Sequence, residues 1–143
     1  MSRYISNALK AKIRQQAKFR CGYCLRSETL IGMPMEFEHI FPIALGGKTN
    51  EENLWLSCRR CNEFKGTQTH TIDPETGEKV KIYNPRTQIW NEHFCWSEEG
   101  TEIIGNNRKY FNWSRHCKCS EIKRRNNCNN AKSLGKRPLV SAR

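Results

Sequence analysis

The sequence predicts a small α+β domain in which two short strands and a helix are stapled by four cysteines. Three observations support this prediction: an amphipathic N-terminal segment, an alternation of apolar and acidic residues that ends near residue 40, and two cysteine pairs with C-x2-C spacing. Only 36% of the 143 residues are hydrophobic, whereas an average globular chain has about 45 to 50% apolar residues. A core of side chains alone is therefore thin, and we expect the cysteines to supply part of the stability.

The N-terminal helix is predicted to begin after Ser6, whose side chain can cap it, and to run to about Phe19. Its apolar positions recur every four residues and form one stripe, made of Ile5, Leu9, Ile13 and Ala17. The remaining surface is basic, through Lys10, Lys12, Arg14 and Lys18. The stripe favours an ordinary amphipathic helix on a small core, with phosphate contacts by the basic side chains as the alternative.

A strand, a loop, a second strand and a short helix are predicted next. Apolar and acidic residues alternate over residues 35–40, which predicts a strand that ends near His39. Proline, paired glycines and asparagine over residues 42–52 predict a surface loop. Residues 53–56 then return to the core as an antiparallel partner strand. Residues from Asn62 to about Lys65 are expected to be the start of a short helix.

Downstream of residue 66 the pattern is weaker. Residues 73–77 read as a turn and residues 80–83 as a strand. We expect four large aromatic side chains to form core rather than a base-stacking platform: Trp55, Trp90, Phe94 and Trp96. His70 and His93 have no acidic or cysteine neighbour at ligand spacing, so we interpret them as structural or surface residues.

Four of the eight cysteines predict a structural zinc site. Cys21 and Cys24 form one C-x2-C pair, and Cys58 and Cys61 form the other. Two such turns can supply four thiolates to a tetrahedral Zn2+. A thiol redox role is the disfavoured alternative, because two separated pairs suit zinc better. A second metal site is not favoured for the other cysteines, which are Cys95, Cys117, Cys119 and Cys128.

The formal net charge of +11 is concentrated at the C-terminal end. Residues 1–104 hold 14 basic and 13 acidic side chains, whereas residues 105–143 hold 11 basic side chains and one acidic one, Glu121. We therefore divide the chain into a domain over 1–104 and a basic, asparagine-rich tail over 105–143. The tail is expected to be poorly ordered, with nucleic-acid binding as the alternative.

The sequence also makes a secreted or membrane-bound protein unexpected. No apolar signal segment follows Met1, and no run of eighteen apolar residues occurs. We expect a cytoplasmic protein without membrane contact, where reduced cysteines favour metal binding over disulfides. No protein partner can be inferred from the sequence.

The motifs between and beside the cysteine pairs resemble those of the HNH endonuclease family. In chain order these motifs are Glu38-His39-Ile40-Phe41-Pro42, Gly46-Gly47, Asn53-Leu54, and the last cysteine pair followed by Asn62 and Lys65. The resemblance covers residues 17–66, which we take as the core motif of an HNH nuclease domain, and is weaker through residues 73–94. It implies a ββα-metal finger and a metal-dependent endonuclease that hydrolyses DNA phosphodiester bonds.

The resemblance also implies a role for each motif residue. His39, neutral at pH 7, is expected to activate the attacking water, while Glu38 and Asn62 hold a catalytic Mg2+ or Mn2+. Asn53 is expected to support the histidine loop. Backbone contacts to DNA are expected from Arg59, Arg60 and Lys65.

Two departures from the family pattern concern the metal ligands. Asn62 stands where the family name has its final histidine, and Glu38 replaces the commoner aspartate. Glu36 lies two residues before Glu38 and therefore points to the same strand face as a further acidic group. The alternative function is a non-catalytic, zinc-dependent module that binds nucleic acid, for which the Glu38-His39 pair is not needed.

Overall fold

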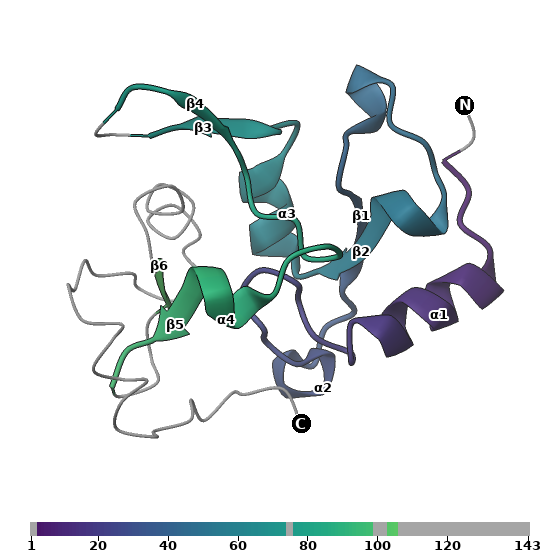
Figure 1. Ribbon diagram of the computed structural model, residues 1–143. Coiled ribbons are helices and arrows are strands. Elements are labelled where there is room, and N and C mark those ends of the chain that lie inside the picture. Colours follow the sequence, from purple (N-terminus) through teal and green to yellow (C-terminus); the bar gives the residue numbers. More distant parts are fainter. Residues whose placement is uncertain (1–2, 74–75, 99–102, 106–143) are drawn as a thin grey trace.

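The computed structural model describes residues 3–73, 76–98 and 103–105. Figure 1 shows short helices around three separate two-stranded sheets. In chain order the elements are α1 (Asn7–Gln16), α2 (Glu28–Ile31), β1 (Glu36–His39), η1 (Ile43–Leu45), η2 (Glu51–Asn53), β2 (Leu54–Ser57), α3 (Arg59–Lys65), β3 (His70–Ile72), β4 (Lys79–Lys81), α4 (Trp90–His93), β5 (Phe94–Trp96) and β6 (Ile103–Gly105). The predicted α+β class is confirmed.

Helix α1 begins where predicted and ends earlier than predicted. The Ser6 hydroxyl accepts a hydrogen bond from the Leu9 amide at 3.2 Å, which caps the helix. The helix ends at Gln16 because Lys18 and Phe19 take positive φ angles of 52° and 56°. Burial along the predicted stripe increases toward the C-terminal end of α1, where Ile13 is fully buried.

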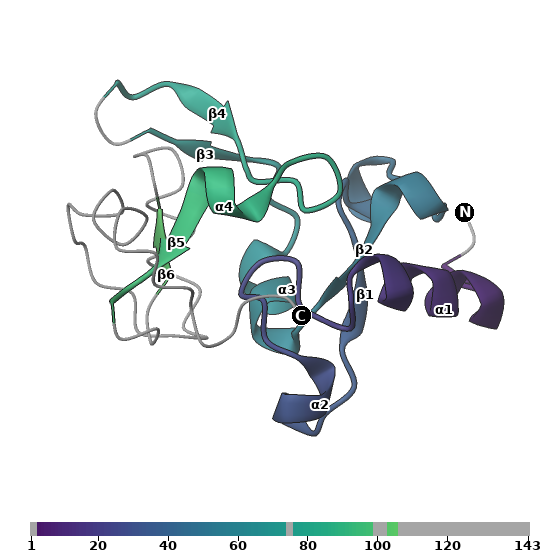
Figure 2. The same cartoon turned by 60° about the horizontal axis from the view of Figure 1, so that its bottom comes forward.

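Strands β1 and β2 form the antiparallel hairpin at the centre of the molecule. The register pairs Glu36 with Ser57 and His39 with Leu54. Helix α1 lies beside β2 and α3 lies beside β1, and both views show the hairpin between them (Figures 1 and 2). Both strands lie within one residue of their expected places, so the β1, β2 and α3 unit matches the predicted ββα arrangement.

Helix α3 starts three residues earlier than the sequence suggested. The Cys58 sulfur accepts a hydrogen bond from the Cys61 amide and occupies the N-cap position. Asn62 therefore lies inside the helix rather than at its start, and its side chain is available for other partners. A cysteine is an unusual cap residue, which is why the sequence did not mark this helix start.

The remaining elements extend from the C-terminal end of α3. Strands β3 and β4 form a hairpin that projects from the molecule on the same side as the loop between β1 and β2 (Figures 1 and 2). The predicted strand over 80–83 is present as β4, displaced by one residue at its start and two at its end. Strand β5 pairs with β6, so ordered structure reaches Gly105.

The core lies between the cysteine turns and the C-terminal elements. Trp90, Phe94 and Trp96 are buried as predicted, with ring centroids 5.5 Å apart for Trp90 and Phe94. Trp55 is only partly buried, and the Arg86 guanidinium covers its ring at 4.9 Å from the centroid. The aromatic set therefore serves as core and not as an open stacking surface.

None of the described helices is long and apolar enough to cross a membrane. The predictions for residues 106–143, including three of the four remaining cysteines, lie outside the described residues. The domain boundary near residue 105 stays a prediction.

Candidate active site and metal centre

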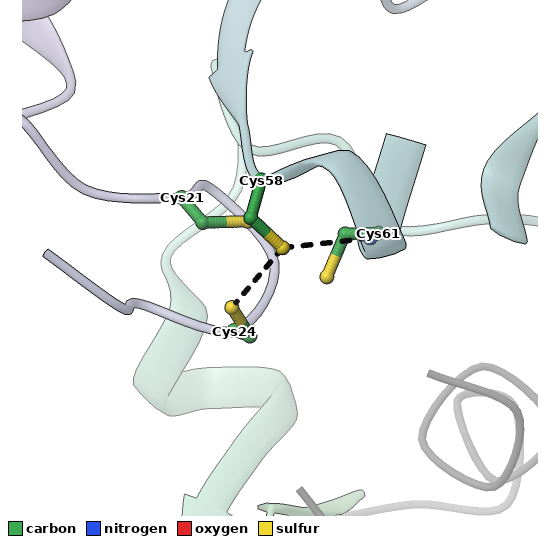
Figure 3. Close-up of side chains that lie close together, drawn as sticks. All are labelled: Cys21, Cys24, Cys58 and Cys61. Atoms are coloured by element: carbon green, nitrogen blue, oxygen red, sulfur yellow. Dashed lines mark hydrogen bonds between the residues drawn. The ribbon is translucent and has the colours of Figure 1, made fainter. Parts of the chain in front are cut away.

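The four cysteines of the two C-x2-C pairs converge on one point. Their sulfur atoms all lie within 4.8 Å of one another, and all four residues are buried. Figure 3 shows the side chains turning toward each other from the turn after α1 and from the start of α3. The Cys24 and Cys58 sulfurs are 3.8 Å apart, which matches the edge of about 3.8 Å in a tetrahedron with zinc–sulfur bonds of about 2.3 Å.

One thiol of the cluster has a lowered pKa. Burial and Cys58 raise the pKa of Cys21, but hydrogen bonds with Cys24 and Cys61 act in the opposite direction, and the pKa lies below its ordinary value. A thiolate is the form that binds metal. The donor set therefore fits a structural Zn2+, as predicted. Cys95 lies apart from this cluster, buried in β5.

The first cysteine turn is fixed by close packing. The Gly22 amide donates to the Leu56 carbonyl at 2.9 Å, which attaches the turn to β2. A Cβ atom at Gly22 would lie 2.3 Å from Cδ1 of Trp55 and 2.7 Å from Pro85. Only glycine fits here, since the indole ring lies directly against the backbone of the turn.

His39 stands at the end of β1 with one nitrogen engaged. Its Nε2 lies 2.9 Å from the Thr49 hydroxyl, which belongs to the loop between β1 and β2. Burial lowers the pKa of the imidazole below 6.5, and the positive charges of Lys65 and Arg3 lower it further. These effects favour the neutral form of His39, whose side chain remains partly exposed.

The Asn53 side chain joins both ends of the loop between β1 and β2 by hydrogen bonds. Its Oδ1 accepts from the Phe41 amide at 2.7 Å, and its Nδ2 donates to the carbonyls of Phe41 and Lys48 at 2.9 and 2.8 Å. These bonds agree with the predicted support of the histidine loop. The contact to the imidazole is made by Thr49, which follows Lys48, so Asn53 acts on His39 through the loop backbone.

Glu38 lies in the interior, 2% exposed, between two side chains. The Tyr23 hydroxyl donates to its Oε1, and the Lys65 ammonium lies 3.5 Å from its Oε2. Burial raises the pKa of Glu38 to about 7, although Lys65 and Tyr23 act in the opposite direction. Oε2 has no hydrogen-bond partner and faces only the Lys65 ammonium among the described side chains.

The structure corrects the expected position of Lys65. Its side chain is 1% exposed, and its ammonium donates to the His39 carbonyl at 3.0 Å. Because the Lys65 ammonium is buried against β1, it does not reach a phosphate from this position. The lysine holds the backbone at the predicted catalytic histidine and offsets the charge of Glu38.

Asn62 and Glu36 form the next contact along the same face of β1. The Asn62 amide donates to Glu36 at 2.5 Å. Among the residues that the structure describes, Glu38 and Asn62 share no hydrogen bond or ion pair, and each of the two expected metal ligands contacts other side chains. Glu36 faces α3 as Glu38 does, in agreement with the predicted strand alternation.

The oxygen donors of this face fit a hard divalent cation. Two carboxylates and an amide oxygen are the ligand types that Mg2+ and Mn2+ take in proteins. The buried Oε2 of Glu38 makes no hydrogen bond, and the Lys65 ammonium near it shows that this position favours a positive charge.

Arg59 and Arg60 are exposed in the first turn of α3. Arg59 pairs with Glu63 at 2.8 Å, which raises the pKa of its guanidinium. Both side chains lie at the surface, where a nucleic-acid backbone can reach them.

Sequence reasoning missed Tyr23 and Thr49. Tyr23 is part of the first cysteine turn and Thr49 is an ordinary loop residue, so neither carries a catalytic signal of its own. Each contact joins positions 10 to 15 residues apart, and only the folded chain reveals them.

The comparison with protein families gives one finding for this region. The model described as HNH endonuclease matches residues 21–68. A comparison with the curated proteins finds no match, and a comparison with the solved structures finds none either. The matched segment begins at the first cysteine of the cluster and contains β1, β2 and α3, and it supports a nuclease-type or nucleic-acid-related function. Residues 21–68 of this chain thus match the HNH endonuclease model and contain a four-cysteine cluster compatible with zinc.

Proposed function

We propose that the protein is a metal-dependent endonuclease that hydrolyses phosphodiester bonds in DNA. The observation that carries the proposal is the pairing of a neutral, partly exposed His39 with the buried Glu38 at the end of one strand. The HNH match over residues 21–68 supports it independently.

His39 is assigned the role of general base. Thr49 occupies Nε2, and when this nitrogen carries the proton, Nδ1 keeps its lone pair for a water proton. A pKa below 6.5 keeps the imidazole in this neutral form at physiological pH. The carbonyl of the same residue is held by Lys65, so both the ring and the backbone are fixed.

Glu38 and Asn62 are assigned to a divalent cation. When bound, a Mg2+ or Mn2+ ion neutralises charge on the phosphate and on the leaving 3′ oxygen. The chain's own part is to hold two oxygen donors on one side of β1, against α3. Glu36 accepts from Asn62 and orients its amide.

We assign contacts with the DNA backbone to positively charged side chains near the site. Arg59 and Arg60 are exposed beside the second cysteine pair. The excess of ten positive charges over residues 105–143 adds a sequence-independent attraction to DNA. The proposal places the protein in the cytoplasm, where thiols stay reduced and available to zinc.

One observation favours a second candidate, a zinc-dependent nucleic-acid binding module without cleavage. The ammonium of Lys65 already lies near the free oxygen of Glu38 at 3.5 Å. A lysine that stays there during catalysis competes with a divalent cation for the same carboxylate.

Cleavage of supercoiled plasmid by the purified full chain distinguishes the two candidates. With Mg2+ or Mn2+ the wild type is expected to nick or linearise the plasmid, while His39→Ala loses activity and keeps its zinc. His70→Ala is the matched control, because it removes a partly buried imidazole from β3 and should leave cleavage intact. If the folded, zinc-loaded wild type binds the plasmid and does not cut it, the binding module is the better description.

A further inference from the structure

We propose that Tyr23 is a positioning residue that fixes the Glu38 carboxylate for the divalent cation and connects it to the zinc cluster. The inference rests on the proposed function, because it concerns the carboxylate that we assign to the catalytic cation. Tyr23 itself is placed too deep to touch a substrate, since its side chain is buried.

The backbone of Tyr23 cannot move independently of the cysteine cluster. It lies between Cys21 and Cys24, whose sulfurs belong to the cluster. The Tyr23 carbonyl accepts a hydrogen bond from the Trp90 indole at 2.8 Å. The preceding residue is hydrogen-bonded to β2 through its amide. These contacts hold the start of the tyrosine side chain in one place.

The ring of Tyr23 is fixed as firmly as its backbone. It packs edge to face against the ring of Tyr83, with centroids 6.2 Å apart. The two rings are both 2% exposed. With backbone and ring fixed, the hydroxyl has one position, and this position lies at Oε1 of Glu38.

The hydrogen bond from Tyr23 determines which oxygen of Glu38 is available. Glutamate has three rotatable side-chain bonds, so an unsupported carboxylate can turn either oxygen toward a cation. Tyr23 engages Oε1, and Oε2 is left without a hydrogen bond on the side of α3. Residues that orient a ligand in this way are part of a metal site, and their loss weakens metal affinity about 10- to 100-fold.

The same contact gives the cysteine cluster a direct effect on the catalytic face. The first cysteine pair holds Tyr23, and the second pair starts α3, which carries Lys65 to the other side of Glu38. Both groups that contact the carboxylate therefore come from segments that the cluster ties down. Zinc is expected to set the geometry of Glu38 as well as the stability of the fold.

The test is the affinity of the zinc-loaded full chain for Mn2+, measured by electron paramagnetic resonance of the free ion. Tyr23→Phe keeps the ring and removes only the hydroxyl, and we expect Mn2+ affinity to fall about 10-fold or more. Tyr83→Phe is the matched control, because it removes a buried hydroxyl whose partner is the Gln88 carbonyl. It should bind Mn2+ like the wild type. Zinc content and thermal midpoint are measured for each variant.

Two outcomes separate this inference from the proposed function. If Glu38→Gln weakens Mn2+ binding and a folded Tyr23→Phe does not, the positioning role is wrong and the metal assignment stands. If Glu38→Gln binds Mn2+ like the wild type, the metal assignment fails and the inference fails with it.

A second measurement covers the case in which Tyr23→Phe does not fold. In wild-type protein labelled with 13C at the tyrosine Cζ, Mg2+ is expected to shift the Tyr23 resonance and to leave the Tyr83 resonance in place. Saturation with Mg2+ without any shift at Tyr23 would overturn the positioning role.

Discussion

His39 shows how a single side chain takes its chemistry from its surroundings. Free histidine is half charged near pH 6.5, and a charged imidazole cannot accept a proton. Burial and the positive charges of Lys65 and Arg3 favour the neutral ring. The loop threonine contacts Nε2, so Nδ1 can accept a proton from water when Nε2 carries the ring hydrogen.

This environment predicts where DNA cleavage loses activity as the pH falls. A base must be unprotonated to act, and its pKa is lowered, so the midpoint of the acidic limb of kcat/KM should lie below pH 6.5. Arg3→Gln removes one of the charges that disfavour imidazolium, so its limb should move to higher pH. The measurement is plasmid nicking against pH, with zinc content checked at each point. A limb above pH 6.5 in the wild type contradicts the assigned base.

Gly22 provides a second test at the residue scale. Gly22→Ala places a Cβ against the Trp55 ring and Pro85, and overpacking of this kind costs about 1 to 3 kcal/mol. We expect a lower free energy of unfolding in urea. Gly32→Ala is the comparison, because Gly32 has a φ of 66° and no atom within 4 Å of an added Cβ. It reports the backbone cost alone, and equal losses in the two variants would contradict the steric explanation.

Among the elements, the connection between β1 and β2 matters most to the site. It contains η1 and η2, and it is closed by the three side-chain hydrogen bonds of Asn53. Gly47 lies within this connection, and a Cβ there would meet the Phe41 carbonyl oxygen at 1.9 Å. The loop therefore has one tight conformation, which presents Thr49 to His39.

Breaking this closure should reduce activity without removing zinc. Asn53→Ala loses all three bonds, with an expected stability loss of about 1 to 3 kcal/mol and a lower kcat. Asn53→Asp keeps an acceptor for the Phe41 amide and loses the two donors, so it should lie between Asn53→Ala and wild type. Steady-state cleavage and urea unfolding provide the two readouts. An Asn53→Ala enzyme with unchanged kcat contradicts the support role.

The elements also show what a sequence can and cannot predict. The hairpin was predictable because alternation along a strand directly reflects which side is buried. The end of α1 was not, because Lys18 and Phe19 adopt positive φ angles that neither residue type favours. The start of α3 depends on a cysteine sulfur as cap, and the sequence identified that cysteine only as a metal ligand.

The residues of the candidate site also fall into those that the sequence predicted and those that it did not. The cysteine cluster was predictable from spacing, and His39 and Asn53 were singled out from their motif. The burial of Lys65 was not, because its partners lie 26 and 27 residues earlier in the chain, on a strand that α3 covers. A lysine in a motif indicates a positive charge, whereas only tertiary packing decides whether that charge meets solvent or a carboxylate.

For the whole molecule, the thin core leaves much of the stability to the four-cysteine cluster, to which we assign a structural zinc ion. The described sheets have two strands each, and isolated pairs of this size are marginal in water. Structural zinc sites contribute on the order of 10 kcal/mol. Chelation should therefore unfold the domain, as seen by circular dichroism, and added Zn2+ should restore it. An unchanged thermal midpoint in metal-free protein contradicts this expectation.

The charge distribution of the whole chain makes a separate prediction about DNA binding. Each phosphate contact contributes about 0.9 to the slope of log K against log salt. If residues 105–143 bind the backbone, replacing Lys123, Arg124 and Arg125 with glutamine should reduce that slope by up to about 2.7. Fluorescence anisotropy of the full chain on a DNA duplex, without Mg2+, measures it. An unchanged slope shows that these three charges stay in solvent.

Two hydrogen bonds limit how short a fragment that carries the HNH match can be. Arg86 donates to the Leu54 carbonyl at 3.1 Å, and Trp90 donates to the Tyr23 carbonyl at 2.8 Å. Both donors lie beyond residue 68, where the HNH match ends. A fragment cut there keeps every motif residue and loses the donors for two carbonyls of its own framework. A graft into another protein therefore has to include the chain through Trp90. Genetic exchange of the motif segment alone would transfer a domain that lacks two of its framework hydrogen bonds.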